Sequence, residues 1–72
     1  MEYLISTTWD AEAGVWIAMS EDVPGLVLES GSLDALMERV KMAVPELLAM
    51  NGKASADIPL YFKSERHDLV HI

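Results

Sequence analysis

The stretch "SEDVPGLVLESGS", residues 20–32, decides the fold of this chain. It contains the pair Pro24-Gly25, in which proline fixes its φ and glycine accepts a positive φ, as the centre of a type II turn requires. The residue before a proline is kept out of the helical region, so Val23 ends the strand that precedes the turn. The stretch therefore predicts a strand, a tight turn and a second strand.

The same stretch also predicts the start of a helix. The run "LVLE", residues 26–29, forms the strand after the turn, and Gly31 breaks it. Ser32 can cap a helix N-terminus with its hydroxyl, and Asp34 is favourable at the positive end of the helix dipole. Apolar residues then recur at helical spacing and form one stripe, at Leu33, Leu36, Met37, Val40, Val44, Leu47 and Leu48.

The second half of this helix contains a proline. An interior proline loses one backbone hydrogen bond and clashes with the preceding turn at a cost of about 3 kcal/mol, so we expect a kink or a restarted turn at Pro45. The pair Asn51-Gly52 suits a left-handed helix cap. A polar link, "KASAD" at residues 53–57, leads to a fourth strand that begins near Ile58 and continues through Phe62.

The N-terminal residues predict a β-hairpin. Apolar and polar residues alternate over residues 3–9 and again over residues 15–19, with the five residues "DAEAG" between them. If Trp9 lies opposite Val15, the odd-numbered residues of both strands share one face. We expect that face to pack on the core.

The predicted order is β-β-β-α-β, an α+β fold with two layers, in which one helix packs on a four-stranded sheet. A right-handed crossover places the fourth strand parallel to the first, which gives the sheet order 3-2-1-4. The chain, residues 1–72, is one domain with a core over about residues 2–63 and a tail over residues 64–72. The fourth strand is an open edge, so we expect a homodimer through that strand or the tail.

Charge is distributed unevenly along the chain. The net charge is −7; residues 1–38 hold eight acids and no Lys or Arg, which gives −8, and the remaining residues hold five bases and four acids, which gives +1. A negative field repels nucleic-acid phosphates and attracts basic surfaces, so we expect a basic protein partner and no direct nucleic-acid binding. A solvated acidic surface that keeps the protein soluble is the simpler interpretation.

The composition also indicates a cellular compartment. The chain has no cysteine, which excludes disulfides, thiolate zinc sites and a thiol nucleophile. The first residues, "MEYLISTTWD", are not typical of a signal peptide, and no apolar run approaches the length of a membrane span. We therefore expect a cytoplasmic protein without a membrane segment.

Two kinds of metal chemistry are unfavourable in this sequence. The carboxylates Asp10 and Glu12 fall at one end of the hairpin and Glu21 and Asp22 at the other, about 20 Å away for strands of six residues. Two-metal catalysis needs its ions about 4 Å apart. The spacing of His67 and His71 could begin a zinc site, but no third ligand is evident, and surface histidines in a tail are the simpler interpretation. We expect no metal, no cofactor and no enzymatic activity.

Three segments carry a resemblance to known families. The segments "WDAEAGVW" at residues 9–16, "DVPGL" at residues 22–26 and "PELLAMNG" at residues 45–52 resemble a small bacterial family described only as a domain of unknown function. That family is similar to the N-terminal domain of HicB-type antitoxins. The resemblance covers residues 3–52 and implies a HicB-like partial ribonuclease H fold and the neutralisation of a small, RNA-cleaving HicA-type toxin. HicB antitoxins usually continue into a DNA-binding segment, which these residues do not contain.

The candidate contacts with such a partner are acidic and apolar. An acidic surface could cover the basic RNA-binding groove of a HicA-like toxin, with Asp10, Glu12 and Glu29 as its charges and Trp16 or Leu26 as its apolar anchor. The alternative is a regulatory or small-ligand-binding domain that uses the uncovered sheet face and has no toxin partner.

Overall fold

A computed structural model describes residues 2–53 and 57–72 of the chain. The elements follow the predicted order and are, in sequence, β1 (Tyr3–Asp10), β2 (Val15–Met19), β3 (Val27–Ser30), α1 (Leu33–Met50) and β4 (Leu60–Glu65). Most of the expected polar link, residues 54–56, lies outside the described residues.

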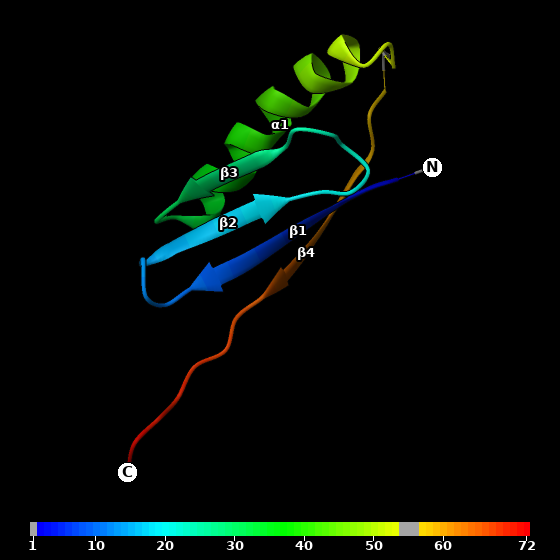
Figure 1. Ribbon diagram of the computed structural model, residues 1–72. Helices are drawn as coiled ribbons and strands as arrows, with labels where there is room; N and C mark the ends of the chain where they lie inside the picture. The colour runs from blue at the N-terminus through cyan, green and yellow to red at the C-terminus, as the bar shows by residue number, and fades with distance from the viewer. Residues whose placement is uncertain (1, 54–56) are drawn as a thin grey trace.

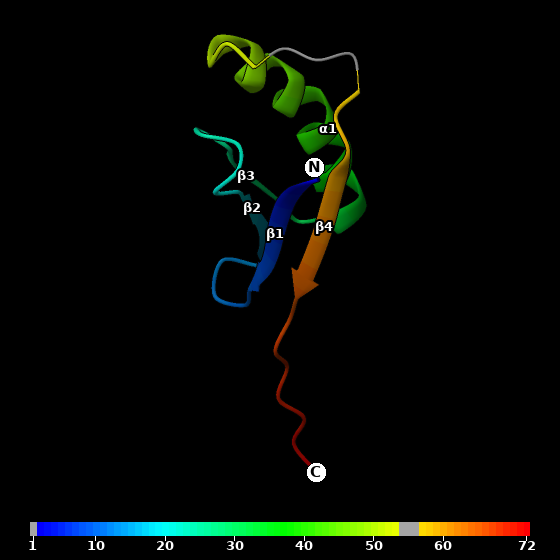
Figure 2. The same cartoon turned by 90° about the vertical axis from the view of Figure 1, so that its right-hand side faces the viewer.

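The four strands form one mixed sheet in the order β3-β2-β1-β4 (Figure 1). β1 is antiparallel to β2 and parallel to β4, and β2 is antiparallel to β3. Helix α1 packs on one face of this sheet, over β2 and β3, and returns the chain to the far side of β1 (Figures 1 and 2). The expected α+β architecture and its sheet order are therefore confirmed.

The register of the β1–β2 hairpin differs from the expected one by a single residue. Trp9 lies opposite Trp16, and Asp10 lies opposite Val15, so the loop has four residues and Asp10 belongs to the strand. The Asp10 carbonyl accepts a hydrogen bond from Gly14 N at 2.8 Å, and Gly14 has a positive φ of 68°. The expected pairing of Trp9 with Val15 is wrong because it assigned Asp10 to the loop.

A one-residue slip moves every side chain of a strand to the opposite face. The core face of β2 is therefore made by Trp16 and Ala18, and Ala18 is completely buried. Met19, which we expected in the core, is 53% exposed. The odd-numbered core face is correct for β1, where Ile5 and Thr7 are completely buried.

The turn at residues 23–26 forms as predicted. Leu26 N donates to the Val23 carbonyl at 3.2 Å, and Gly25 has a φ of 88°, which matches a type II turn. Val23 and Leu26 are both buried in the core, so the turn is fixed by packing on each side of Pro24. β3 begins at Val27, one residue later than expected.

Helix α1 begins at its predicted cap and buries its predicted stripe. The Ser32 hydroxyl accepts from Ala35 N at 3.3 Å, and Asp34 lies in the first turn. The buried core joins the helix stripe to the sheet and the turn and comprises Ile5, Ala18, Val23, Leu26, Leu36, Val40, Val44 and Leu48.

The C-terminal half of α1 differs from the prediction at Pro45 and agrees with it at the helix end. One helix continues through Pro45, so the expectation of a restarted turn is wrong. Pro45 and Lys41, whose carbonyl loses its donor, are both exposed, so water can bind that carbonyl. The C-terminus of α1 is a Schellman motif, in which Gly52 N donates to the Ala49 carbonyl and Lys53 N donates to the Leu48 carbonyl.

The C-terminal residues extend the sheet and then leave it. β4 runs to Glu65, and residues 66–72 form neither helix nor strand and project beyond the sheet (Figure 2). The Thr7 and Ser64 hydroxyls lie 2.6 Å apart and share a hydrogen bond across the β1–β4 pair. The tail therefore begins at residue 66, two residues later than expected.

Candidate functional site

Helix α1 covers one face of the sheet, and we call the opposite, uncovered face the open face (Figure 2). The strand registers place on it every second residue of each strand, namely Leu4, Ser6, Thr8, Asp10, Val15, Ile17, Met19, Val27, Glu29, Tyr61, Lys63 and Glu65. Several of its large apolar side chains are exposed, with Met19 and Tyr61 each at 53% and Val27 at 64%. Exposed apolar side chains gathered on one face are typical of a binding surface.

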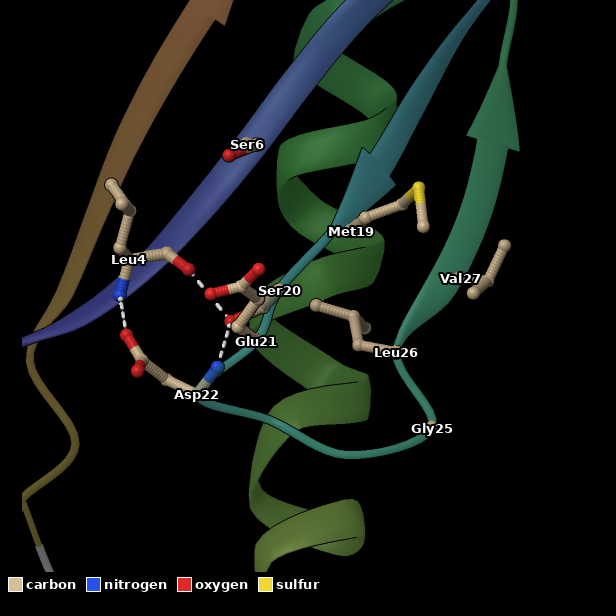
Figure 3. A pocket seen from close by; sticks show the side chains of 9 residues that line it. All are labelled: Leu4, Ser6, Met19, Ser20, Glu21, Asp22, Gly25, Leu26 and Val27. Carbon is tan, nitrogen blue, oxygen red and sulfur yellow. Dashed lines mark hydrogen bonds between the residues drawn. The ribbon is translucent and has the colours of Figure 1, made fainter.

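An open pocket of about 590 Å³ lies where the open face meets the turn at residues 20–26 (Figure 3). The apolar part of its lining comes from Leu4, Met19, Leu26 and Val27. Glu21 and Asp22 are the acids that line it. A ligand or side chain that enters here would therefore contact apolar groups on the sheet and carboxylates at the rim.

Ser20 and Asp22 attach the turn to the start of β1. Asp22 Oδ2 accepts from Leu4 N at 2.8 Å, and the Ser20 hydroxyl donates to the Leu4 carbonyl at 2.6 Å (Figure 3). The Ser20 hydroxyl also accepts from Asp22 N at 3.1 Å. The β1–β2 ladder ends at the pair Ser6–Met19, so these side chains replace the next strand pair. We call this group of three hydrogen bonds the Leu4 clamp.

The hairpin acids have different roles. Asp10 Oδ1 accepts from Glu12 N and from Ala13 N, both at 3.1 Å, so this carboxylate caps the hairpin loop. Glu12 lies in that loop and is exposed. The carboxylates of Asp10 and Glu12 are at the opposite end of β2 from Glu21 and Asp22, as the sequence predicts.

Glu29 is the predicted contact that best fits a binding surface. It is exposed on the open face of the edge strand β3, opposite Ile17. Its backbone carbonyl accepts from Arg39 Nη1 at 2.7 Å, which attaches β3 to the helix. Among the open-face residues, Lys63 is basic, and Asp10, Glu29 and Glu65 are acidic.

The two predicted anchors are placed differently. Leu26 is only 2% exposed and belongs to the core, so its side chain offers a partner no more than a small part of the pocket wall. Trp16 is half-buried on the helix side of the sheet and packs against both the core and Trp9. Neither side chain is an exposed anchor on the open face.

Sequence reasoning missed the apolar residues that the open face does present. Met19 and Val27 are neighbours across β2 and β3, and Leu4 and Tyr61 are neighbours across β1 and β4. The alternation in the sequence marks them as sharing faces, but the misplaced hairpin register assigned Met19 to the core. The signal that could have placed Met19 on the open face was the loop of four residues, 11–14, which ends in Gly14.

The described residues, 2–53 and 57–72, hold no group of three or more His, Asp or Glu side chains that could bind a metal ion. His67 is exposed beside Glu65, with 3.6 Å between His67 Nε2 and Glu65 Oε2, and His71 is exposed in the extended tail. Within the same residues, no helix is both long enough and apolar enough to cross a membrane.

Known proteins similar to this chain support its fold and family. A crystal structure of the hypothetical protein TTHA1013 from the extremely thermophilic bacterium Thermus thermophilus is 38% identical, with a TM-score of 0.75 over 100% of both chains. No protein with a curated description matches the chain. The model of the family described as "Domain of unknown function (DUF1902)" matches residues 2–71. The predicted membership in a family of unknown function is thereby confirmed: the chain belongs to the DUF1902 family.

Proposed function

We propose that this chain is a protein-binding module of the antitoxin type, which neutralises a small, basic, RNA-cleaving toxin similar to HicA. The observation that carries the proposal is the open face, where exposed apolar side chains lie between carboxylates on the sheet face that the helix leaves uncovered. The resemblance of residues 3–52 to the HicB N-terminal domain supports the same partner.

The charges of the module complement such a partner. Residues 1–38 carry −8, and the exposed acids Glu12, Glu21 and Glu29 all belong to this part. A protein that binds RNA holds the phosphates with basic side chains, and carboxylates can occupy the same side chains. Inhibition then requires only competition for the RNA-binding surface of the toxin, without any covalent step. We assign this inhibition to the cytoplasm.

Affinity would come from the exposed apolar side chains of the open face. Interfaces take most of their binding energy from a few well-packed central residues, while charges at the rim mainly raise the association rate. Met19 and Val27 lie side by side at the turn end of that face, and Glu29 follows Val27 on the same face of the edge strand. We therefore assign the anchor to Met19 and Val27 in place of Trp16 or Leu26.

The test uses RNA cleavage by a HicA-like protein from the same genome. Wild-type chain should protect RNA in proportion to its concentration, and Glu29→Lys and Glu12→Lys should each weaken protection at low salt. Glu46→Lys is the matched control, because Glu46 is exposed on the helix and its replacement by lysine changes the net charge by the same amount. Full protection by both variants, or cleavage unaffected by the wild-type chain, would contradict the proposal.

A small-ligand-binding function is the second candidate, and the pocket beside the turn favours it. Its volume of about 590 Å³ falls within the range of about 300–1,000 Å³ that is usual for ligand sites. Ser20 and Asp22 are occupied by the Leu4 clamp, so Glu21 is the lining carboxylate left to bind a ligand, which would be apolar with a positive charge. A thermal-shift screen of apolar amines against wild type and Glu21→Gln tests this candidate; stabilisation independent of Glu21 would refute it.

Self-association through β4 is a further part of the proposal. β4 is an edge of the sheet, and the tail after it carries Leu69, Val70 and Ile72 with their side chains exposed. Edge strands pair readily with other chains, and two copies of β4 could extend the sheet across a two-fold axis. Light scattering after gel filtration should give the mass of two chains, and the mass of one chain would contradict this part of the proposal.

A further inference from the structure

A pair of tryptophans lies at the hairpin end of the sheet, on the helix side. Trp9 and Trp16 are directly opposite in β1 and β2, with ring centroids 5.5 Å apart and ring planes tilted by 57°. Both side chains are half-buried. Trp16 also packs against the core, so the strands and the core hold this aromatic pair in position.

The aromatic pair binds a cation from the chain itself. Arg66 is the first residue after β4, and its guanidinium carbon lies 4.3 Å from the Trp9 ring centroid and 5.8 Å from that of Trp16. Both distances are within the range of about 6 Å over which a cation is attracted to an aromatic face. One guanidinium thus contacts two rings at once, which is how aromatic cages recognise cations.

The Arg66 side chain is held less firmly by the fold than the two tryptophan rings that it contacts. It follows the last residue of the sheet, and its side chain is 44% exposed. Its other contact is an ion pair with Asp68, in which Arg66 Nε donates to Asp68 Oδ2 at 2.9 Å and the Asp68 side chain is 60% exposed. Exposed ion pairs contribute little to stability, so a competing cation can replace Arg66 while the rings stay fixed.

The surroundings favour a second cation over an anion. The Asp68 carboxylate lies beside the site, where it pairs with the Arg66 guanidinium, and the exposed Glu12 lies in the hairpin loop that follows Trp9. A planar guanidinium stacks on aromatic rings and is more weakly hydrated than an ammonium group, so arginine suits the site better than lysine.

From this geometry we infer that the Trp9–Trp16 pair is a binding site for an arginine side chain of a basic partner, and that Arg66 occupies it in the free chain. This inference rests on the proposed function for the identity of the partner and specifies the chemistry that the partner must present. Binding exchanges one guanidinium for another, so Arg66 acts as an internal competitor.

The test uses the intrinsic fluorescence of the chain, which has two tryptophans, both in this pair. The probes are the blocked peptides Gly-Arg-Gly-Arg-Gly and Gly-Lys-Gly-Lys-Gly, equal in charge and titrated at constant ionic strength. We expect the arginine peptide to bind more tightly to wild type. Arg66→Ala should tighten arginine-peptide binding about two- to fivefold, the range that corresponds to an exposed cation–π contact.

Arg66→Ala also makes the chain more negative, which would strengthen binding of both peptides equally. The matched control is Lys63→Ala, which makes the same change in net charge on the opposite sheet face and should tighten arginine-peptide binding less than Arg66→Ala does. The ratio of the two peptide affinities, which exceeds one in wild type, should fall to about one in Trp9→Leu. Thermal unfolding of each variant checks that it is folded. Equal tightening of arginine-peptide binding in Arg66→Ala and Lys63→Ala, or equal affinities for both peptides in wild type, would overturn the inference.

These measurements are independent of the toxin assay. Protection of RNA without any preference for the arginine peptide would refute the arginine site and retain the antitoxin function. A clear preference for the arginine peptide in a chain that fails to protect RNA would retain the arginine site and refute the antitoxin function.

Discussion

Removal of the Asp22 carboxylate should destabilise the fold by breaking the Leu4 clamp. Asp22→Ala deletes the acceptor of a 2.8 Å hydrogen bond from Leu4 N, at the point where the β1–β2 ladder has ended. Hydrogen bonds to charged groups contribute roughly 1.5–3 kcal/mol, and this one is exposed, so we expect a loss near the neutral value of about 1 kcal/mol. For a domain of this size, that loss lowers Tm by about 4–8 °C.

Thermal unfolding followed by circular dichroism at neutral pH measures this change. Asp22→Asn is the matched control, because its amide oxygen can still accept from Leu4 N, and it should lose less than half as much stability. Ser20→Ala removes the hydrogen bond to the Leu4 carbonyl and the acceptor of Asp22 N. Because both side chains hold the same residue, the double variant should lose less than the sum of the two single losses. A Tm change below about 2 °C in Asp22→Ala, well under the expected range, or strict additivity, would refute the clamp.

Two further predictions concern the core and the turn. Leu36→Ala should lower the free energy of unfolding by about 2–5 kcal/mol, because Leu36 is completely buried, whereas Met42→Ala, at a side chain 76% exposed, should change it by less than about 0.5 kcal/mol in chemical denaturation. Gly25→Ala should cost about 1–2 kcal/mol, because Gly25 has a φ of 88°, and Gly31→Ala should cost nothing, because Gly31 does not need a positive φ. Equal denaturation midpoints for the two alanine variants at Gly25 and Gly31 would contradict the second prediction.

Local chemistry made most of the fold predictable. The Pro24-Gly25 turn, the Ser32 cap and the Asn51-Gly52 end depend on residues within a few positions of one another, and each forms as expected. The predicted right-handed crossover, with the fourth strand parallel to the first, gave the sheet order that the structure has.

The parts that could not be predicted depend on choices that the sequence leaves nearly balanced. Asp10 can continue a strand or begin a loop, and its carboxylate serves the second of these roles by capping Glu12 N and Ala13 N. That ambiguity shifts β2 by one residue and places Met19 on the open face in place of the core. The clamp on Leu4 joins residues 18 positions apart, so no local pattern could reveal it.

The aromatic pair shows the same limit. The sequence predicts Trp9 opposite Val15 and Trp16 as a partner anchor, and the meeting of the two tryptophans depends on the hairpin register. The approach of Arg66 depends on where β4 ends beside β1. A site assembled from three segments becomes visible only once all the strands are aligned.

The parallel pairing of β4 with β1 has a consequence for the order in which the molecule opens. Helix α1 contacts β2 and β3, and β4 hydrogen-bonds to β1 alone within the sheet. Thermal fluctuation can therefore release β4 while the hairpin, the turn and the helix stay folded. In the monomer, amide protons of β4 should exchange with deuterated solvent faster than those of β2, and limited proteolysis should first cut the chain on the C-terminal side of α1.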